Sequence, residues 1–235
     1  MNLMRSAGSG ILLNERAVAA MYFTAAFTLS SGFCSFPSGS PIALALAGAG
    51  VGTIGFIDDD EVSLTNLHRQ LLYGESQLGQ PKAKAAAQRL ANLNSEVCLR
   101  PHVGRFTASN ACNLISSYDL VIDGCDNFAT RYVIDDACAQ LGKPYIYGAV
   151  GGLEGQVSVF HYGASPRRYR DLYPDEQAML SMPQPGKEIL GTVPGVVGNI
   201  MAQQAMQLVA GFGELLTGRL WTINLGTLET YCLEF

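Results

Sequence analysis

"SPIALALAGAGVGTIGFIDDD" (residues 40–60) predicts a helix followed directly by a buried strand, and the rest of the chain can be read outward from it. Pro41 stands near the first position of the predicted helix, where its missing N–H is tolerated, and glycines follow near the helix end. The run VGTIGFI (51–57) is continuously apolar, which is typical of a parallel strand buried on both faces. Asp58 then ends this strand.

Helix-like and strand-like segments alternate along the rest of the sequence. Further helices are predicted at 79–94, 128–142 and 194–211. Further strands are predicted at 96–103, 118–127, 143–150, 155–162, 219–225 and 228–235. This alternation predicts an α/β fold: a Rossmann-like, mostly parallel sheet flanked by helices, with closing antiparallel strands at the C-terminal end.

The length of the chain suits one domain, which we expect to span residues 1–235. Residues 163–191 combine Pro, Gly and charge with little periodicity, and we interpret them as a long crossover loop that carries function. The apolar stretch 17–33 is short for a membrane span and contains Thr and Ser, so a buried segment is expected there.

Composition excludes several classes of protein. Hydrophobic residues make up 48% and charged residues 15% of the 235 positions, which predicts a globular protein with a proper core. The net charge of −5 argues against a surface for nucleic acid, which requires clustered Lys and Arg. Six cysteines are scattered without a Cys-x-x-Cys pair, as in reduced cytoplasmic proteins. We therefore expect a cytoplasmic protein that binds neither nucleic acid nor membrane.

Acidic residues end two of the predicted strands. Ligands of open parallel sheets bind beyond the carboxyl ends of the strands, so these residues are candidates for a binding site. Asp58 lies 19 positions after Gly39, close to the spacing of about 20 residues at which a carboxylate meets ribose hydroxyls. Asp126 ends the strand at 118–127, where it can hold a magnesium ion against phosphate oxygens.

Cationic and amide side chains lie between these two aspartates in the sequence. Asn66 and Arg69 fall in the predicted loop SLTNLHRQ (63–70), and Lys82 opens a helix. A helix N-terminus attracts anions, and two cations beside it favour a triphosphate over an uncharged ligand. The alternative is that Arg69 and Lys82 are solvated surface charges and that the aspartates cap helices.

An ordered series of motifs resembles the ThiF/MoeB/HesA family, the bacterial relatives of the ubiquitin-activating enzymes. The resemblance covers about residues 40–235 and rests on AGAGVGTIGFIDDDEVSLTNLHRQLL, GQPKA, DLVIDGCDNFATRYVIDDAC, GKPYIYGAVGGLEGQVSVF and GTVPGVVGNIMAQQAMQLV. It implies an ATP-dependent adenylyltransferase that uses Mg²⁺ to activate the C-terminal carboxylate of a ubiquitin-like sulfur carrier ending in Gly-Gly, in a thiamine or molybdopterin type of pathway. It also implies a homodimer, which the apolar helix at 194–211 is suited to support.

The resemblance also implies roles for individual residues. By position, Asp58 is similar to the ribose-binding aspartate of the family, and Asp126 is similar to its magnesium aspartate. Asn66, Arg69 and Lys82 resemble its phosphate-binding residues. Gly39 is a remnant of its glycine-rich phosphate loop.

That phosphate loop is where the chain departs most from the family. The family pattern is approximately Gly-x-Gly-Gly-x-Gly-Ser-Pro, whereas this chain reads CSFPSGSP (34–41). Phe36 and Pro37 add bulk and remove an N–H where backbone must approach phosphate. An alternative function is therefore a catalytically impaired member that serves as a binding or dimerisation module. Because matching flanks bound the divergent residues 16–38, a frameshifted stretch is a further hypothesis.

Other departures bear on metals and on covalent chemistry. Many family members hold zinc on two Cys-x-x-Cys pairs, but Arg168 and Asp171 stand where the first pair would fall, so no zinc site is expected. The crossover loop contains no cysteine, which favours adenylation alone. Cys125 is interpreted as a small residue that ends a strand. We expect structural or surface roles for His68, His102 and His161, and a core position for Trp221.

A third function, nicotinamide-dependent oxidoreduction, also uses an acidic residue after the second strand. Such an oxidoreductase does not require Arg69, Lys82 and Asp126 together, so the sequence favours an adenylyltransferase.

Overall fold

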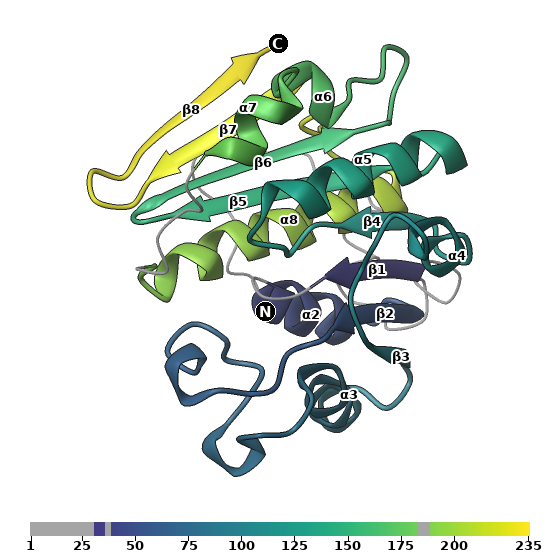
Figure 1. Cartoon of the computed structure of the whole chain (residues 1–235), viewed down its shortest axis with the longest axis vertical. Helices are drawn as coiled ribbons and strands as arrows, with labels where there is room; N and C mark the ends of the chain where they lie inside the picture. The colour runs from purple at the N-terminus through teal and green to yellow at the C-terminus, as the bar shows by residue number, and fades with distance from the viewer. Residues whose placement is uncertain (1–30, 36–38, 183–188) are drawn as a thin grey trace, which may run out of the picture.

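The computed structural model describes residues 31–35, 39–182 and 189–235, and one mixed sheet runs through them (Figure 1). The strand order is β3-β2-β1-β4-β5-β6-β7-β8. The first five strands in this order are parallel, and the remaining three pair antiparallel. The strands are β1 (Ser31–Ser35), β2 (Thr53–Asp58), β3 (Cys98–Val103), β4 (Leu120–Ile122), β5 (Tyr145–Gly151), β6 (Glu154–Phe160), β7 (Arg219–Asn224) and β8 (Glu229–Glu234). The predicted fold class is confirmed.

Helices cover both faces of the sheet and enclose a hydrophobic core on each side. On one face lie α2 (Gly39–Gly48), α3 (Lys82–Leu93) and α8 (Thr192–Ala210), and on the other lie α4 (Ala111–Ile115) and α5 (Phe128–Leu141). The predicted two-sided burial of the strand at 51–57 is confirmed: Phe56 packs in the first core and Ile57 in the second. None of the helices in the described ranges has both the length and the hydrophobicity that a membrane span requires.

The central strand β1 is the element that the sequence did not predict as a strand. It pairs with β2 on one side and with β4 on the other, so connections from the centre of the sheet diverge in both directions. Such a switch point is where open α/β sheets bind ligands. The predictions for most of 17–33 and for the phosphate loop fall on residues 1–30 and 36–38, which lie outside the described part of the chain.

The crossover segment after β6 differs from the predicted loop, because it contains two short helices. These are α6 (Tyr169–Leu172) and α7 (Glu176–Ser181), and both pack against α5. Helices of one or two turns are too short to produce a recognisable hydrophobic period, which explains why the sequence did not reveal them. The segment is therefore anchored to the body of the protein, at least as far as Met182.

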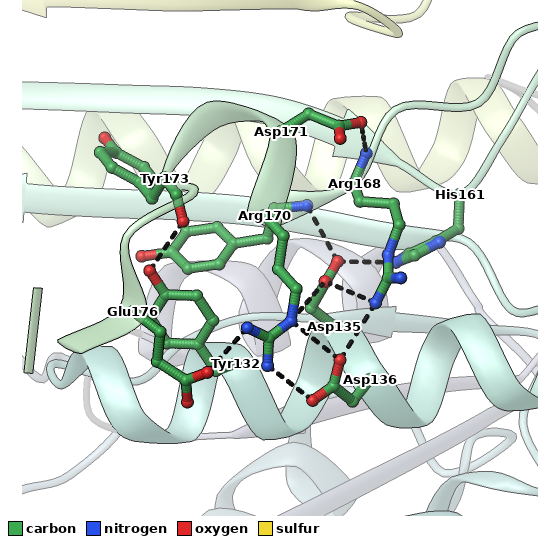
Figure 2. A network of polar contacts seen from close by, with 10 residues as sticks. Tyr132, Asp135, Asp136, His161, Arg168, Arg170, Asp171, Tyr173 and Glu176 are labelled. Carbon is green, nitrogen blue, oxygen red and sulfur yellow. Dashed lines mark hydrogen bonds and ion pairs between the residues drawn. The ribbon is translucent and has the colours of Figure 1, made fainter.

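A network of charges provides this anchor (Figure 2). The carboxylate of Asp135, on α5, is fully buried. It accepts hydrogen bonds from the backbone N–H of Tyr169 (2.9 Å) and from Arg168 Nη2 (3.1 Å), and His161 Nε2 lies 2.8 Å away. Arg168 also reaches the half-exposed Asp136 at 3.0 Å. A buried carboxylate with this many donors fixes the start of α6.

Arg170 extends the network toward α7. Its guanidinium pairs with Asp136 at 2.8 Å and with Glu176 at 2.7 Å, and it lies 4.7 Å from the centre of the Tyr132 ring (Figure 2). The Tyr132 hydroxyl donates to the carbonyl of Tyr173 at 2.8 Å. The α6 segment is thus bonded to α5 across more than 30 positions of sequence, and α7 is linked to this network through the Arg170–Glu176 pair.

The antiparallel edge of the sheet is the most exposed part of the structure. All six residues of β8 are exposed, and Figure 1 shows this strand at the opposite edge from β3. Trp221 on β7, which the sequence placed in the core, is only partly buried and packs against the edge of one core.

Candidate active site

A cavity of about 240 Å³ lies beyond the carboxyl ends of the parallel strands. Its walls come from the end of β2, from the turn after β3, and from the loop that joins β4 to α5. The lining residues are Ile57, Asp58, Asp59, Asp60, Gly104, Arg105, Phe106, Cys125, Asp126, Asn127 and Thr130. Because β1 lies between β2 and β4, the cavity coincides with the switch point of the sheet. Two of the candidate residues, Asp58 and Asp126, line it together.

Asp58 ends β2 with one satisfied and one unsatisfied carboxylate oxygen. Its Oδ1 accepts a hydrogen bond from the backbone N–H of Asp60 at 2.7 Å. Its Oδ2 is buried and has no hydrogen-bond partner among the described residues. Burial raises the pKa of Asp58 to about 6, although Lys82 and the Asp60 N–H act to lower it. A buried acceptor in this state fits a ligand that brings hydroxyl donors, such as a ribose.

Lys82 is buried and paired, so the alternative of a solvated surface charge does not describe it. The side chain is 1% exposed, and its Nζ lies 2.6 Å from Oδ2 of Asp60, whose own side chain is 65% exposed. Lys82 is the first residue of α3, directly after Pro81, as the sequence predicts. Asp60 lines the cavity, and it connects Lys82 to the site.

Asn66 and Arg69 form a pair of their own, and the structure does not bring them into the wall of the cavity. Arg69 Nη2 donates to Asn66 Oδ1 at 3.0 Å, and Arg69 Nη1 donates to the carbonyl of Thr65 at 3.2 Å. Asn66 ends the short helix η1 (Leu64–Asn66). Both side chains are partly exposed, and neither belongs to the residues that line the cavity.

Asp126 lies in the loop between β4 and α5, with its side chain exposed to the cavity. The next residue, Asn127, caps α5 by accepting a hydrogen bond from the N–H of Thr130 at 2.9 Å. The preceding residue, Cys125, is buried, and burial first of all, with Asp123 adding to it, holds the pKa of its thiol well above the usual value. A thiol that stays protonated is a poor nucleophile, which agrees with a structural role for Cys125.

The start of α2 offers a second unsatisfied group. Gly39 and Ser40 are both fully enclosed, and Ser40 Oγ has no hydrogen-bond partner in the described ranges. The free N–H groups of a helix start favour anions, so the α2 N-terminus suits phosphate as the sequence predicts for Gly39. The unusual loop residues 36–38 precede this helix and lie outside the described part.

Sequence reasoning missed two residues that the structure brings to this region. Asp60 pairs with Lys82, and the signal for it was the run of three aspartates directly after the strand. Tyr73 is 7% exposed, and its hydroxyl has no hydrogen-bond partner among the described residues. Burial raises the pKa of Tyr73, and the charges of Asp58 and Asp60 raise it further. No sequence pattern predicted this buried hydroxyl.

The comparisons with known proteins agree with this geometry. The model of the ThiF family matches residues 38–233. The chain is 42% identical over 186 residues to a "probable adenylyltransferase/sulfurtransferase MoeZ" of Mycobacterium tuberculosis, which matches 77% of this chain and 47% of that protein. It is 40% identical over 187 residues to a "sulfur carrier protein adenylyltransferase" of Thermus thermophilus, which matches 77% of this chain and 69% of that protein.

Solved structures share the fold. The structure of E. coli MccB with ATP superposes with a TM-score of 0.77 at 19% identity, covering 93% of this chain and 66% of that one. The chain spans less than half of the length of several curated relatives, for example 38% of the MOCS3-2 protein of Zea mays. The parallel sheet, the switch point and the acidic cavity agree with this family. Because the family model matches most of the sequence, this chain belongs to the ThiF family.

Proposed function

We propose that the chain is an ATP-dependent adenylyltransferase that activates the C-terminal carboxylate of a ubiquitin-like sulfur carrier, in a thiamine or molybdopterin type of pathway. The observation that carries the proposal is the meeting of Asp58 and Asp126 in one cavity at the switch point. The names of the relatives support it, because an adenylyltransferase and a sulfur carrier occur in them.

In the proposed complex, the residues of this chain hold ATP by its two ends. Asp58 Oδ2 accepts hydrogen bonds from the ribose hydroxyls, and the α2 N-terminus with Gly39 and Ser40 faces the phosphates. Lys82, which pairs with Asp60, neutralises phosphate charge. Arg69 and Asn66, which are paired with each other outside the residues that line the cavity, contact the phosphates as well. Asp126 holds Mg²⁺, which when bound neutralises the charge that grows on the phosphates.

The proposed reaction needs no general base. A carrier carboxylate is already ionised at neutral pH, so its oxygen attacks the α-phosphorus directly. A bond forms between that oxygen and phosphorus, the bond to the β-phosphate bridging oxygen breaks, and pyrophosphate leaves. Positioned cations stabilise the transition state more than the ground state, which is how such sites gain rate.

We propose further that no zinc is held by this chain. The two positions where the first cysteine pair of the family would fall are engaged in other contacts: Arg168 binds Asp135, and Asp171 accepts from the Arg168 N–H at 2.8 Å. These side chains do not form a zinc site. The five cysteines that the structure describes are free, which supports a cytoplasmic location.

The family resemblance supports a homodimer as well, although α8 is less available for it than its apolar sequence predicts. Much of this helix packs against α2, β5 and β6 within the chain. Sedimentation velocity of the purified protein tests the dimer.

Exchange of labelled pyrophosphate into ATP, with a carrier protein ending in Gly-Gly, tests the proposed reaction. We expect exchange that depends on the carrier and is lost in Asp126→Ala. Asp119→Ala, at the start of β4 and away from the cavity lining, is the matched control and retains exchange. Equal exchange in wild type and Asp126→Ala would contradict the proposal.

A further inference from the structure

A buried ion pair lies directly beneath the loop that carries Asp126. Asp123, at the end of β4, is fully buried, and Arg131, in the second turn of α5, is 4% exposed. Arg131 Nε donates to Asp123 Oδ2 at 3.1 Å. Desolvating two charges is costly, and an apolar pair of similar size often stabilises a fold as well or better. The pair therefore calls for an explanation beyond stability.

The contacts of this pair converge on one residue of the loop, Cys125, and hold the peptide units on both sides of it. Asp123 Oδ1 accepts from the N–H of Cys125 at 2.7 Å, and Arg131 Nη2 donates to the carbonyl of Cys125 at 3.0 Å. That carbonyl belongs to the peptide plane that leads into Asp126. On the other side of Asp126, the Asn127 cap fixes the loop to the start of α5.

The ion pair is itself held in place by aromatic residues. The Tyr145 hydroxyl donates to Asp123 Oδ2 at 3.1 Å. The guanidinium of Arg131 lies 5.4 Å from the centre of the Tyr147 ring and 5.8 Å from that of Phe128. A planar guanidinium that is held this way presents its donors in fixed directions.

The Asp126 carboxylate depends on this arrangement, because its own side chain has no hydrogen bond or ion pair within the described ranges. Its position is set through the backbone alone. We propose that the Arg131–Asp123 pair is a positioning device that holds Asp126 in the geometry required to bind the divalent cation of the nucleotide. This inference rests on the proposed function, and it adds Arg131, Asp123 and Tyr145 as residues that act through Asp126.

Binding of Mn²⁺ tests the proposal without relying on turnover. The free Mn²⁺ is measured by electron paramagnetic resonance during titration of the full chain in the presence of α,β-methylene-ATP. Arg131→Lys keeps the positive charge but not the fork of donors that joins Asp123 to the Cys125 carbonyl. We expect it to weaken Mn²⁺ binding about tenfold, as loss of a supporting contact to a metal ligand typically does. Tyr145→Phe removes one donor and is expected to weaken binding by a smaller factor.

A second ion pair on the same helix supplies the control. Asp136→Asn alters the network of Figure 2, further along α5, and within the described ranges the ion pairs of Asp136 reach Arg168 and Arg170 and not the Asp126 loop. We expect this variant to bind Mn²⁺ like the wild type. Asp126→Ala is the reference for complete loss of the metal contact.

The outcomes separate the inference from the function on which it rests. Wild-type Mn²⁺ affinity in Arg131→Lys and in Tyr145→Phe, with weakened binding in Asp126→Ala, overturns the positioning role and leaves the proposed function intact. Wild-type affinity in Asp126→Ala overturns the metal role of Asp126 and the inference together. If Arg131→Lys fails to fold, the result with Tyr145→Phe decides.

Discussion

Asp58 carries, at the scale of a single residue, the charged group that is least well satisfied by the fold around the cavity. Its buried Oδ2 has no hydrogen-bond partner in the described part of the chain, and burial raises its pKa to about 6. An unpaired buried carboxylate costs stability, and it persists in native proteins mainly where it has a function. The ionised Asp58 side chain therefore opposes folding locally, while the two cores on either side of the sheet maintain the fold.

Removal of the Asp58 charge is expected to stabilise the free protein at neutral pH. The pKa is higher in the folded state than the ordinary value of 3.8, so ionisation opposes folding. The penalty is absent below about pH 4, grows between about pH 4 and 6, and is complete above that range. It amounts to roughly 3 kcal/mol. Urea unfolding should therefore show Asp58→Asn to be more stable than wild type at pH 8, with the difference vanishing toward pH 4.

Asp59→Asn is the matched control for this experiment, because Asp59 is exposed and adjacent. We expect it to change the free energy of unfolding by less than about 0.5 kcal/mol at either pH. A destabilised Asp58→Asn at pH 8 would contradict the assignment of Asp58 as an unsatisfied buried charge.

Lys82 is expected to matter for the reaction more than for the fold. Lys82→Met keeps a long chain in the buried position and leaves only the exposed Asp60 unpaired. We expect pyrophosphate exchange to fall by about 10² to 10³, as for other removed transition-state donors. Lys84→Met, two positions further along α3 and exposed, should retain the wild-type rate. A similar loss in both variants would argue against a specific role.

At the scale of elements, ion pairs in the crossover segment stabilise the two short helices α6 and α7. A helix as short as α6 or α7 is unstable in isolation, so its contacts with α5 must stabilise it. Asp135 and Asp136 are neighbours in the sequence and share Arg168, yet the first is fully buried and the second is half-exposed. Burial decides how much each pair contributes.

Asp135→Asn is expected to destabilise the protein by about 3–5 kcal/mol, because it removes a fully buried charge and replaces one of the two acceptor oxygens by an NH₂ donor facing Arg168 or His161. Asp136→Asn should cost less than about 1 kcal/mol, since its pairs are exposed to solvent. Guanidinium unfolding of both variants measures the difference. Equal losses of unfolding free energy in the two variants would show that the burial of Asp135 does not decide how strongly this network stabilises the protein.

The same network leads to a prediction about metals. Because Arg168 and Asp171 take part in it in place of cysteines, a strong chelator should leave the melting temperature unchanged. Raised salt should lower it slightly, since part of the network is exposed. Differential scanning calorimetry with and without EDTA checks this, and a drop in melting temperature on chelation would reveal a metal that the network does not explain.

At the scale of the whole molecule, the sequence predicted the layered α/β architecture and most elements, because long apolar runs and amphipathic helices are strong signals. It also predicted that Asp58 and Asp126 lie at one edge of the sheet, which follows from parallel strands having their carboxyl ends together. It did not predict β1 as a strand, because residues 16–38 depart from the family pattern.

The remaining features could not be read from the sequence, because they depend on side-chain contacts between distant positions. The Asp135 network joins residues 26 to 34 positions apart, and Arg131 reaches Asp123 across the start of a helix. The pairing of Arg69 with Asn66 depends on a rotamer, and no periodicity encodes it.

Calorimetric titration of the protein with ATP and Mg²⁺ tests whether Asp58 and Asp126 line one nucleotide site although the glycine-rich loop is altered. We expect ATP to bind the wild type, and to bind Asp58→Ala more weakly with or without metal. In Asp126→Ala, we expect the affinity for ATP to lose only the contribution of Mg²⁺. No detectable binding to the wild type, or equal binding by all three proteins, would contradict the account.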